Sequence, residues 1–188
     1  MMIRLLLTTL VALRLSAALA HVQDGIFAAS AGSPQKASIT FTSNITAGNS
    51  IVVMIMQFNS GTRTYSVSDT VSGSSGWTKA VGNNSSNQNV EVWYKANHAG
   101  GTTTVEAVHN TSTVQFHATA IEVSGFGSSI TVAASGTIDE TTNVTSHTCT
   151  SGLTYGSEVL AACANVLSAD GGEVNPGTGY AEVPTGNV

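Results

Sequence analysis

The alternation of side chains after residue 21 restricts this chain to β-structure. β-Branched and aromatic residues alternate with polar ones between clusters of Gly, Asn and Ser, and no helical apolar period persists. Many short strands at this spacing are typical of an antiparallel β-sandwich. The predicted strands are about 37–43, 50–58, 63–69, 76–82, 89–96, 102–109, 114–124, 130–136, 146–151 and 157–166.

Residues 1 to 20 have the three parts of a signal peptide. Arg4 precedes an apolar run from Leu5 to Leu13, and Ala18 and Ala20 form a small-residue cleavage motif. The run is too short to span a membrane. We therefore expect a secreted, extracellular protein whose single domain covers 21–188, with a cut after Ala18 as the alternative.

Without the leader the chain is acidic. Four basic residues face eleven acidic ones, a net charge of about −7, since Arg4 and Arg14 leave with the leader. Affinity for nucleic acids comes mainly from Lys and Arg at phosphates, so we expect no nucleic-acid partner. A surface of Ser, Thr, Asn and Gly suits extracellular life and contact with sugars.

A weak internal repeat joins two distant segments. Residues 38–57 align without gaps on 146–165, and each copy reads as a strand, a turn closed by Gly and an apolar strand. If each copy forms a hairpin, Phe41 faces Ile55 in the first.

The repeat also makes a prediction for the two cysteines. Cys149 and Cys163 occupy the positions equivalent to Phe41 and Ile55. An even cysteine count in an exported protein favours a disulfide, which would be worth on the order of 3 kcal/mol for so short a loop. Two buried free thiols are the alternative. In either case we expect the cysteines to have a structural role.

Several segments together resemble a known group of proteins. The ordered set "TAGNSIVV", "VSDT", "GWTKAVG", "VEVWYKANHAGG", "TVEAV" and "AIEVSG" is similar to mostly uncharacterised exported bacterial and phage-associated proteins with an immunoglobulin-like or jelly-roll β-sandwich. The resemblance implies a fold and an exported setting, and it carries no catalytic motif. Members of the group continue for two more strands past a "GTGY"-like turn. This implies a chain truncated at the C-terminus, or one with an open sheet edge at which copies self-associate and polymerise by strand addition.

His21 is the first candidate for chemistry. If cleavage follows Ala20, its terminal amine and imidazole, with His98, His109, His117 or His147 as a second ligand, have the donors of a copper-binding histidine brace. Such a site resembles that of lytic polysaccharide monooxygenases. We carry this copper-dependent oxidative enzyme as an alternative, and expect no other cofactor.

Two acidic residues are the second candidate. Glu91 and Glu106 lie on strands joined by the "ANHAGG" turn, which would place them as paired carboxylates of a glycosidase. Exposed acids are also the ordinary means of keeping a β-surface soluble. We favour the second reading and expect no catalysis.

The aromatic residues carry the leading hypothesis. Sugar-binding sandwiches stack pyranose faces on exposed Trp or Tyr. If the valines of "NVEVWYK" face the core, Trp93 points outward between two charges; the alternatives are that Trp93 covers a second apolar layer or that Tyr94 is the exposed ring. We expect a non-catalytic module that binds an extracellular glycan or a cell surface through Trp93, Tyr94, Trp77 and Tyr65.

Overall fold

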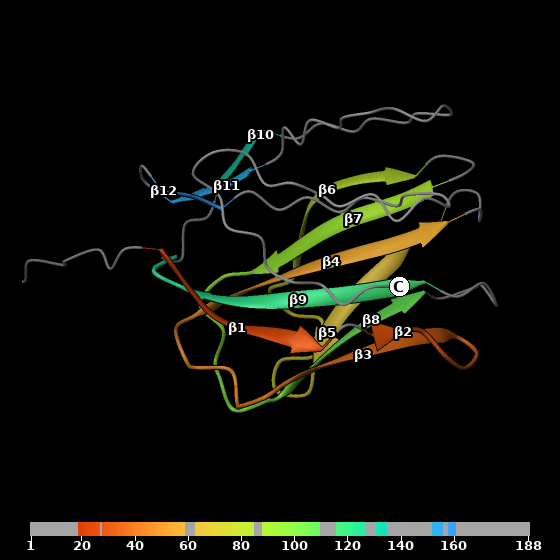
Figure 1. Cartoon of the computed structure of the whole chain (residues 1–188), viewed down its shortest axis with the longest axis horizontal. Coiled ribbons are helices and arrows are strands. Elements are labelled where there is room, and N and C mark those ends of the chain that lie inside the picture. The colour runs from red at the N-terminus through yellow and green to blue at the C-terminus, as the bar shows by residue number, and fades with distance from the viewer. Residues whose placement is uncertain are drawn as a thin grey trace, which may run out of the picture.

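The chain folds into antiparallel β-structure (Figure 1). The computed structural model describes residues 19–26, 28–58, 63–84, 88–109, 116–126, 131–134, 152–155 and 158–160. These residues form no helix, and so none that is long and apolar enough to cross a membrane. The strands are β1 Ala20–Ile26, β2 Ala28–Ala29, β3 Gln35–Phe41, β4 Ser50–Phe58, β5 Tyr65–Asp69, β6 Thr78–Asn84, β7 Gln88–Lys95, β8 Thr104–His109, β9 His117–Ser124, β10 Thr131–Ala134, β11 Gly152–Tyr155 and β12 Glu158–Leu160.

One curled sheet makes up most of the molecule. Its strand order is β5-β8-β3-β1-β9-β4-β7-β6, with the short β2 paired to β9. The first strand joins the two halves, because its residues Ala20 to Asp24 pair with β9 and its residues Gly25 and Ile26 pair with β3. A Cβ at position 25 would overlap Ile39 Cγ2, so only glycine fits where β1 passes from one half to the other. The all-β, antiparallel sandwich class expected from the sequence is confirmed.

The main core lies between the two halves. Side chains of β3, β5 and β8 in one half meet those of β4 and β9 in the other, and Phe116 and Ile39 are fully buried among them. Alternate residues of each strand point inward, as the strand period of two requires. The core consists of Ala37, Ile39, Phe41, Ile45, Ile51, Val53, Ile55, Tyr65, Val67, Trp77, Val105, Ala107, Phe116, Ala118 and Ala120.

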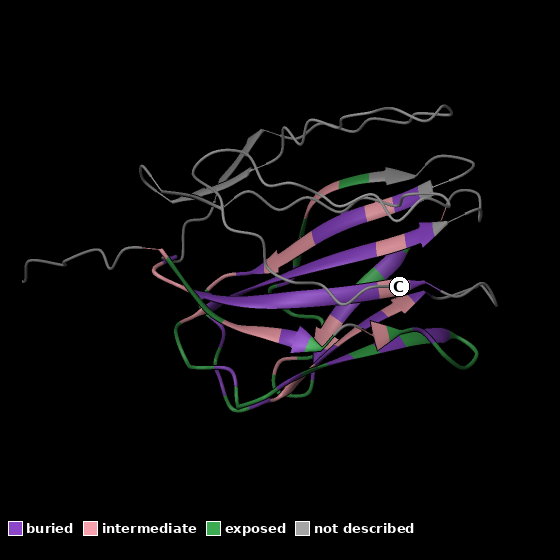
Figure 2. Cartoon of the chain, in the orientation of Figure 1, coloured by how far each residue is buried: buried purple, intermediate pink, exposed green. Residues whose placement is uncertain are grey.

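A second apolar layer lies on the outer face of the β9-β4-β7 half. Val52 is fully buried there, and Val92, Ile121, Val123 and Phe126 are nearly so. Figure 2 shows β4 and β9 buried along most of their length. β4 therefore reads as a nearly continuous apolar run, as strands buried on both faces do, whereas β9 also buries the polar Thr119 and Glu122.

The predicted first hairpin is wrong. β3 pairs with β1 and β8, and β4 pairs with β7 and β9, so Phe41 and Ile55 lie in opposite halves of the sheet and meet only through the core. The two copies of the repeat agree in part where both are described, since 158–160 and the aligned 50–52 are both strands, whereas 152–155 is a strand and the aligned 44–47 is not. Cys149 and Cys163, residues 1–18 of the expected leader and the C-terminal edge lie outside the described residues.

Strands β10, β11 and β12 form a separate antiparallel sheet of three strands. In the curled sheet, β5 and β6 are the outermost strands among the described residues, and each is paired along one side within its sheet. The candidate site involves β6, its neighbour β7 and the end of β5.

Candidate functional site

Two strands carry the same short motif. "GWTK" leads into β6 and "VWYK" ends β7, and the two strands are antiparallel with Lys79 opposite Trp93. The same alignment brings Lys95 close to Trp77, and Lys95 Nζ lies 5.6 Å from the centre of the Trp77 ring. Each lysine therefore lies beside the tryptophan of the other strand.

One of these pairs is partly open to solvent, and a carboxylate holds it together. The Trp93 Nε1 donates to Glu91 Oε2 at 2.7 Å, and Lys79 Nζ donates to Glu91 Oε1 at 3.2 Å. The carboxylate is buried, at 1% exposure, whereas the Lys79 side chain is 43% exposed and the indole half-buried. We call Lys79, Glu91 and Trp93 the Trp93 site.

The other pair is closed. Asp69, at the end of β5, accepts from Trp77 Nε1 at 3.1 Å and from Lys95 Nζ at 3.0 Å, and the Lys95 and Asp69 side chains are 8% and 0% exposed. The main-chain N–H groups of Val71 and Ser72 donate to its other oxygen at 2.9 and 2.7 Å. We call Asp69, Ser72, Trp77 and Lys95 the Asp69 cluster.

Hydrogen bonds keep the Asp69 carboxyl ionised. Burial alone raises the pKa of this group, but the donors of Ser72, Lys95 and Trp77 outweigh burial and hold the pKa far below its usual range. Lys95 also donates to Ser75 O at 2.8 Å, so neither charge of the buried pair is left without partners. The Asp69 cluster thus fixes the loop between β5 and β6 and closes the core beside the Trp93 site.

The four predicted sugar-binding residues do not form one surface. Tyr65 and Trp77 are buried in the main core, and Tyr94 packs against the outer apolar layer. Trp93 does not point outward. The valines of its strand pack in one apolar layer and the half-buried indole packs against the other, which agrees with the alternative that the strand lies between two apolar layers. Trp93 and Tyr94 are both partly exposed, and Trp93 is the one of these two that contacts a charged pair, Lys79 and Glu91.

Tyr65 has a structural environment. Its hydroxyl donates to Gln57 Oε1, and its ring meets the edges of His109 and Phe116 with centroids 5.2 Å apart in each pair. Burial raises the pKa of the Tyr65 hydroxyl, and the nearby charge of Glu91 raises it further. The ring therefore packs inside the sandwich as a neutral phenol.

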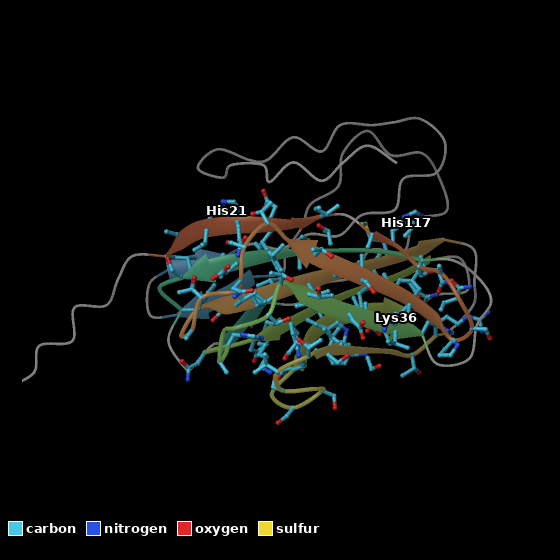
Figure 3. The ribbon with its side chains drawn as sticks, turned by 90° about the horizontal axis from the view of Figure 1, so that it is seen from below. His21, Lys36 and His117 are labelled. Carbon is cyan, nitrogen blue, oxygen red and sulfur yellow. The ribbon has the colours of Figure 1, made fainter. Side chains whose placement is uncertain are left out.

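The structure does not bring His21 together with His117, and His147 lies outside the described residues. His21 is exposed and its Nε2 lies 2.7 Å from Asp24 Oδ1, whereas His109 is buried against Tyr65. His21 pairs with Val123 near one end of β9, and His117 begins that strand at the other end, roughly 20 Å away at about 3.3 Å per residue. Figure 3 shows this separation of His21 and His117. Among the described residues no group of three or more His, Cys, Asp or Glu side chains is placed to hold a metal ion.

The carboxylate pair, which was the reading not favoured, is not formed. The favoured reading of two exposed acids is wrong for Glu91, which is buried, whereas Glu106 is partly exposed. β7 and β8 lie in different halves of the curled sheet, with Glu91 buried and bound to Lys79. Glu106 instead pairs with Lys36 at 2.6 Å on a partly exposed face. The "ANHAGG" segment is a crossover between halves rather than a hairpin turn, which is why the two acids are separated.

Sequence reasoning singled out Trp93 but missed its partners Glu91 and Lys79. The repeated Trp-x-Lys motif was the available signal, because antiparallel pairing of two such motifs places each lysine near the other tryptophan. Comparison with protein-family models, with curated proteins and with solved structures found no match. The chemistry of the Trp93 site is therefore the observation that bears on function.

Proposed function

We propose that this protein is an exported, non-catalytic binding module and that its Trp93 site binds carbohydrate. The observation that carries the proposal is the partly exposed indole of Trp93, whose orientation is fixed by the hydrogen bond to Glu91. An aromatic ring held in one orientation offers a stacking surface for a sugar face at little cost in conformational entropy.

The two charged residues suit binding better than catalysis. Both oxygens of the Glu91 carboxylate already accept hydrogen bonds, and the carboxylate is buried. Glycoside hydrolysis uses two carboxyl groups facing one bond, and Glu106 lies in the other half of the sheet. The Lys79 ammonium has three N–H groups, of which one donates to Glu91, so two remain for hydroxyl oxygens of a ligand.

Truncation of the Trp93 site tests this proposal. We expect the purified exported protein to bind a subset of a glycan array, and Trp93→Ala and Lys79→Ala to weaken that binding about tenfold or more by calorimetry, since each removes on the order of 1.5 kcal/mol of contact. Trp93→Phe keeps a ring but loses the N–H bond to Glu91, so we expect an intermediate affinity.

Lys36→Ala is the matched control. Lys36 is 45% exposed and paired with Glu106, much as Lys79 is 43% exposed and paired with Glu91, but it lies in the other half of the sheet. The Lys36→Ala variant should bind the glycan with the affinity of the wild type. Equal binding by Trp93→Ala and the wild type would show that the site is elsewhere, and a wild-type protein that binds no glycan would contradict the function itself.

A further inference from the structure

The loop from β7 to β8 is held against the loop from β3 to β4 by the main chain. His98 N donates to Asn49 O at 2.7 Å, and Gly48 N donates to His98 O at 2.9 Å. Further along, Ile45 N donates to Thr102 O at 2.8 Å. We call residues 42–49 and 96–103 the end loops, because they close one end of the sandwich.

The His98 side chain is buried between these loops and the core. Its Nδ1 accepts a hydrogen bond from Gly100 N at 2.8 Å, so in the neutral ring Nδ1 carries no proton and Nε2 carries the single one. Nε2 lies 3.5 Å from Asp69 Oδ2 and makes no hydrogen bond. The contact to Gly100 is therefore one that only the neutral ring can make.

Three charged groups face the ring from three strands. Asp69 lies at the end of β5, Lys95 at the end of β7 and Glu122 on β9. Burial lowers the pKa of His98 and Lys95 lowers it further, while Asp69 and Glu122 raise it; burial prevails. The ring is thus neutral when the protein is folded at neutral pH.

Both carboxylates near His98 are already engaged. Glu122 accepts from Thr46 N at 2.9 Å and from Asn49 Nδ2 at 2.6 Å, and these bonds, with that of Gln23, outweigh burial and lower its pKa. Asp69 is held ionised by the Asp69 cluster. Both acids therefore stay ionised in mildly acidic solution, and of the three groups His98 is the one with a proton to gain.

We propose that His98 is a proton-operated latch that holds the end loops closed when neutral and releases them when protonated. A proton taken from solvent binds at Nδ1, where the new N–H group faces the Gly100 N–H. Two donors cannot share a hydrogen bond, so the link to Gly100 is lost. The imidazolium is then attracted to Asp69, in competition with Lys95 and Trp77.

The direction of the pH effect follows from proton linkage. In the opened state the ring titrates near its ordinary pKa of 6.5, and in the closed state its pKa is lower. The closed state therefore has its full stability above pH 6.5 and loses it as the pH falls below that value. One proton changes the closed-to-open equilibrium constant by up to about tenfold per pH unit.

Hydrogen exchange of the end-loop amides tests the latch. In the full-length exported protein, the protection factors of the Gly48 and His98 amides, corrected for intrinsic exchange, should fall by up to about tenfold between pH 6.5 and 5.5. His98→Asn keeps an acceptor for Gly100 but has no proton to gain, so its protection factors should stay constant over this range. His21→Asn, a change at an exposed histidine, should behave as the wild type.

The titration of His98 itself gives a second readout. The imidazole proton resonances of the wild type should report a pKa below 6.5, and the end-loop amides should shift with the same midpoint. A His98→Asn protein that retains the wild-type pH dependence would overturn the proposal. A His98 resonance that titrates at or above 6.5 would overturn it as well, even if the Asn variant does not fold.

Discussion

Replacing Lys95 with methionine is expected to lower the free energy of unfolding by about 3–5 kcal/mol, because it leaves the Asp69 carboxylate buried without a cation. The two side chains are 8% and 0% exposed, so water cannot replace the lost ammonium. The variant also loses the hydrogen bond to Ser75 O that helps to hold the loop between β5 and β6. Urea unfolding followed by circular dichroism measures the change.

Lys36→Met provides the comparison. Lys36 forms an ion pair of similar length with Glu106, but its side chain is 45% exposed, and exposed pairs contribute about 0–1 kcal/mol. The Lys95 loss should also shrink in acid, since an uncompensated Asp69 can neutralise itself by taking a proton. Equal losses for the two lysine variants would show that burial of the Asp69 cluster does not govern its energetics.

Gly100→Ala is expected to destabilise the fold by about 2–4 kcal/mol. A Cβ at this position would lie 2.8 Å from Ala47 N and 3.0 Å from Ile45 O. Both are main-chain atoms, and Ile45 O already accepts from Gly101 N, so they cannot move aside as a flexible side chain would. The φ of +80° adds a conformational penalty of about 1 kcal/mol for any residue with a Cβ.

Gly101→Ala separates these two contributions. Gly101 has almost the same φ, +81°, but a Cβ there would meet nothing within 4 Å. We expect it to lose about 1 kcal/mol, the conformational part alone. Thermal and urea unfolding of both variants check the difference, and equal losses would mean that the end loops accommodate the added methyl group.

The sequence predicted most of the strands because the signal for a strand is local, but β1 and β2 lie in none of the predicted ranges and β11 lies where a turn was predicted. The predicted strand 50–58 coincides with β4, and 89–96 differs from β7 by one residue at each end. Alternation also assigned Glu91, Trp93 and Lys95 correctly to a common face of β7. Alternation left open whether that face is exposed or covers a second apolar layer, because only the tertiary structure shows that this half of the sheet is buried on both sides.

Partners between strands were predicted poorly. Both wrong pairings, Phe41 with Ile55 and Glu91 with Glu106, came from treating consecutive strands as hairpins. Gly-rich and Asn-rich connections suit a tight hairpin and a crossover between the two halves equally, so local sequence does not distinguish them. The buried charges were missed for the same reason, since Asp69 meets Lys95 only after β5 and β7 are placed in different halves of the sheet.

The sequence by itself determined where most strands form, which side chains of a strand share a face and that the chain is an all-β, antiparallel protein, because these follow mainly from the period of two along a strand. Tertiary structure decided that Glu91 fixes the Trp93 indole, that Lys95 neutralises Asp69 and that His98 lies between acids from two other strands. Glu91 and Trp93 are two residues apart on β7, but the other contacts join residues far apart in the chain, and the energies of all of them depend on burial. Burial is set only when the two halves of the sheet close over one core.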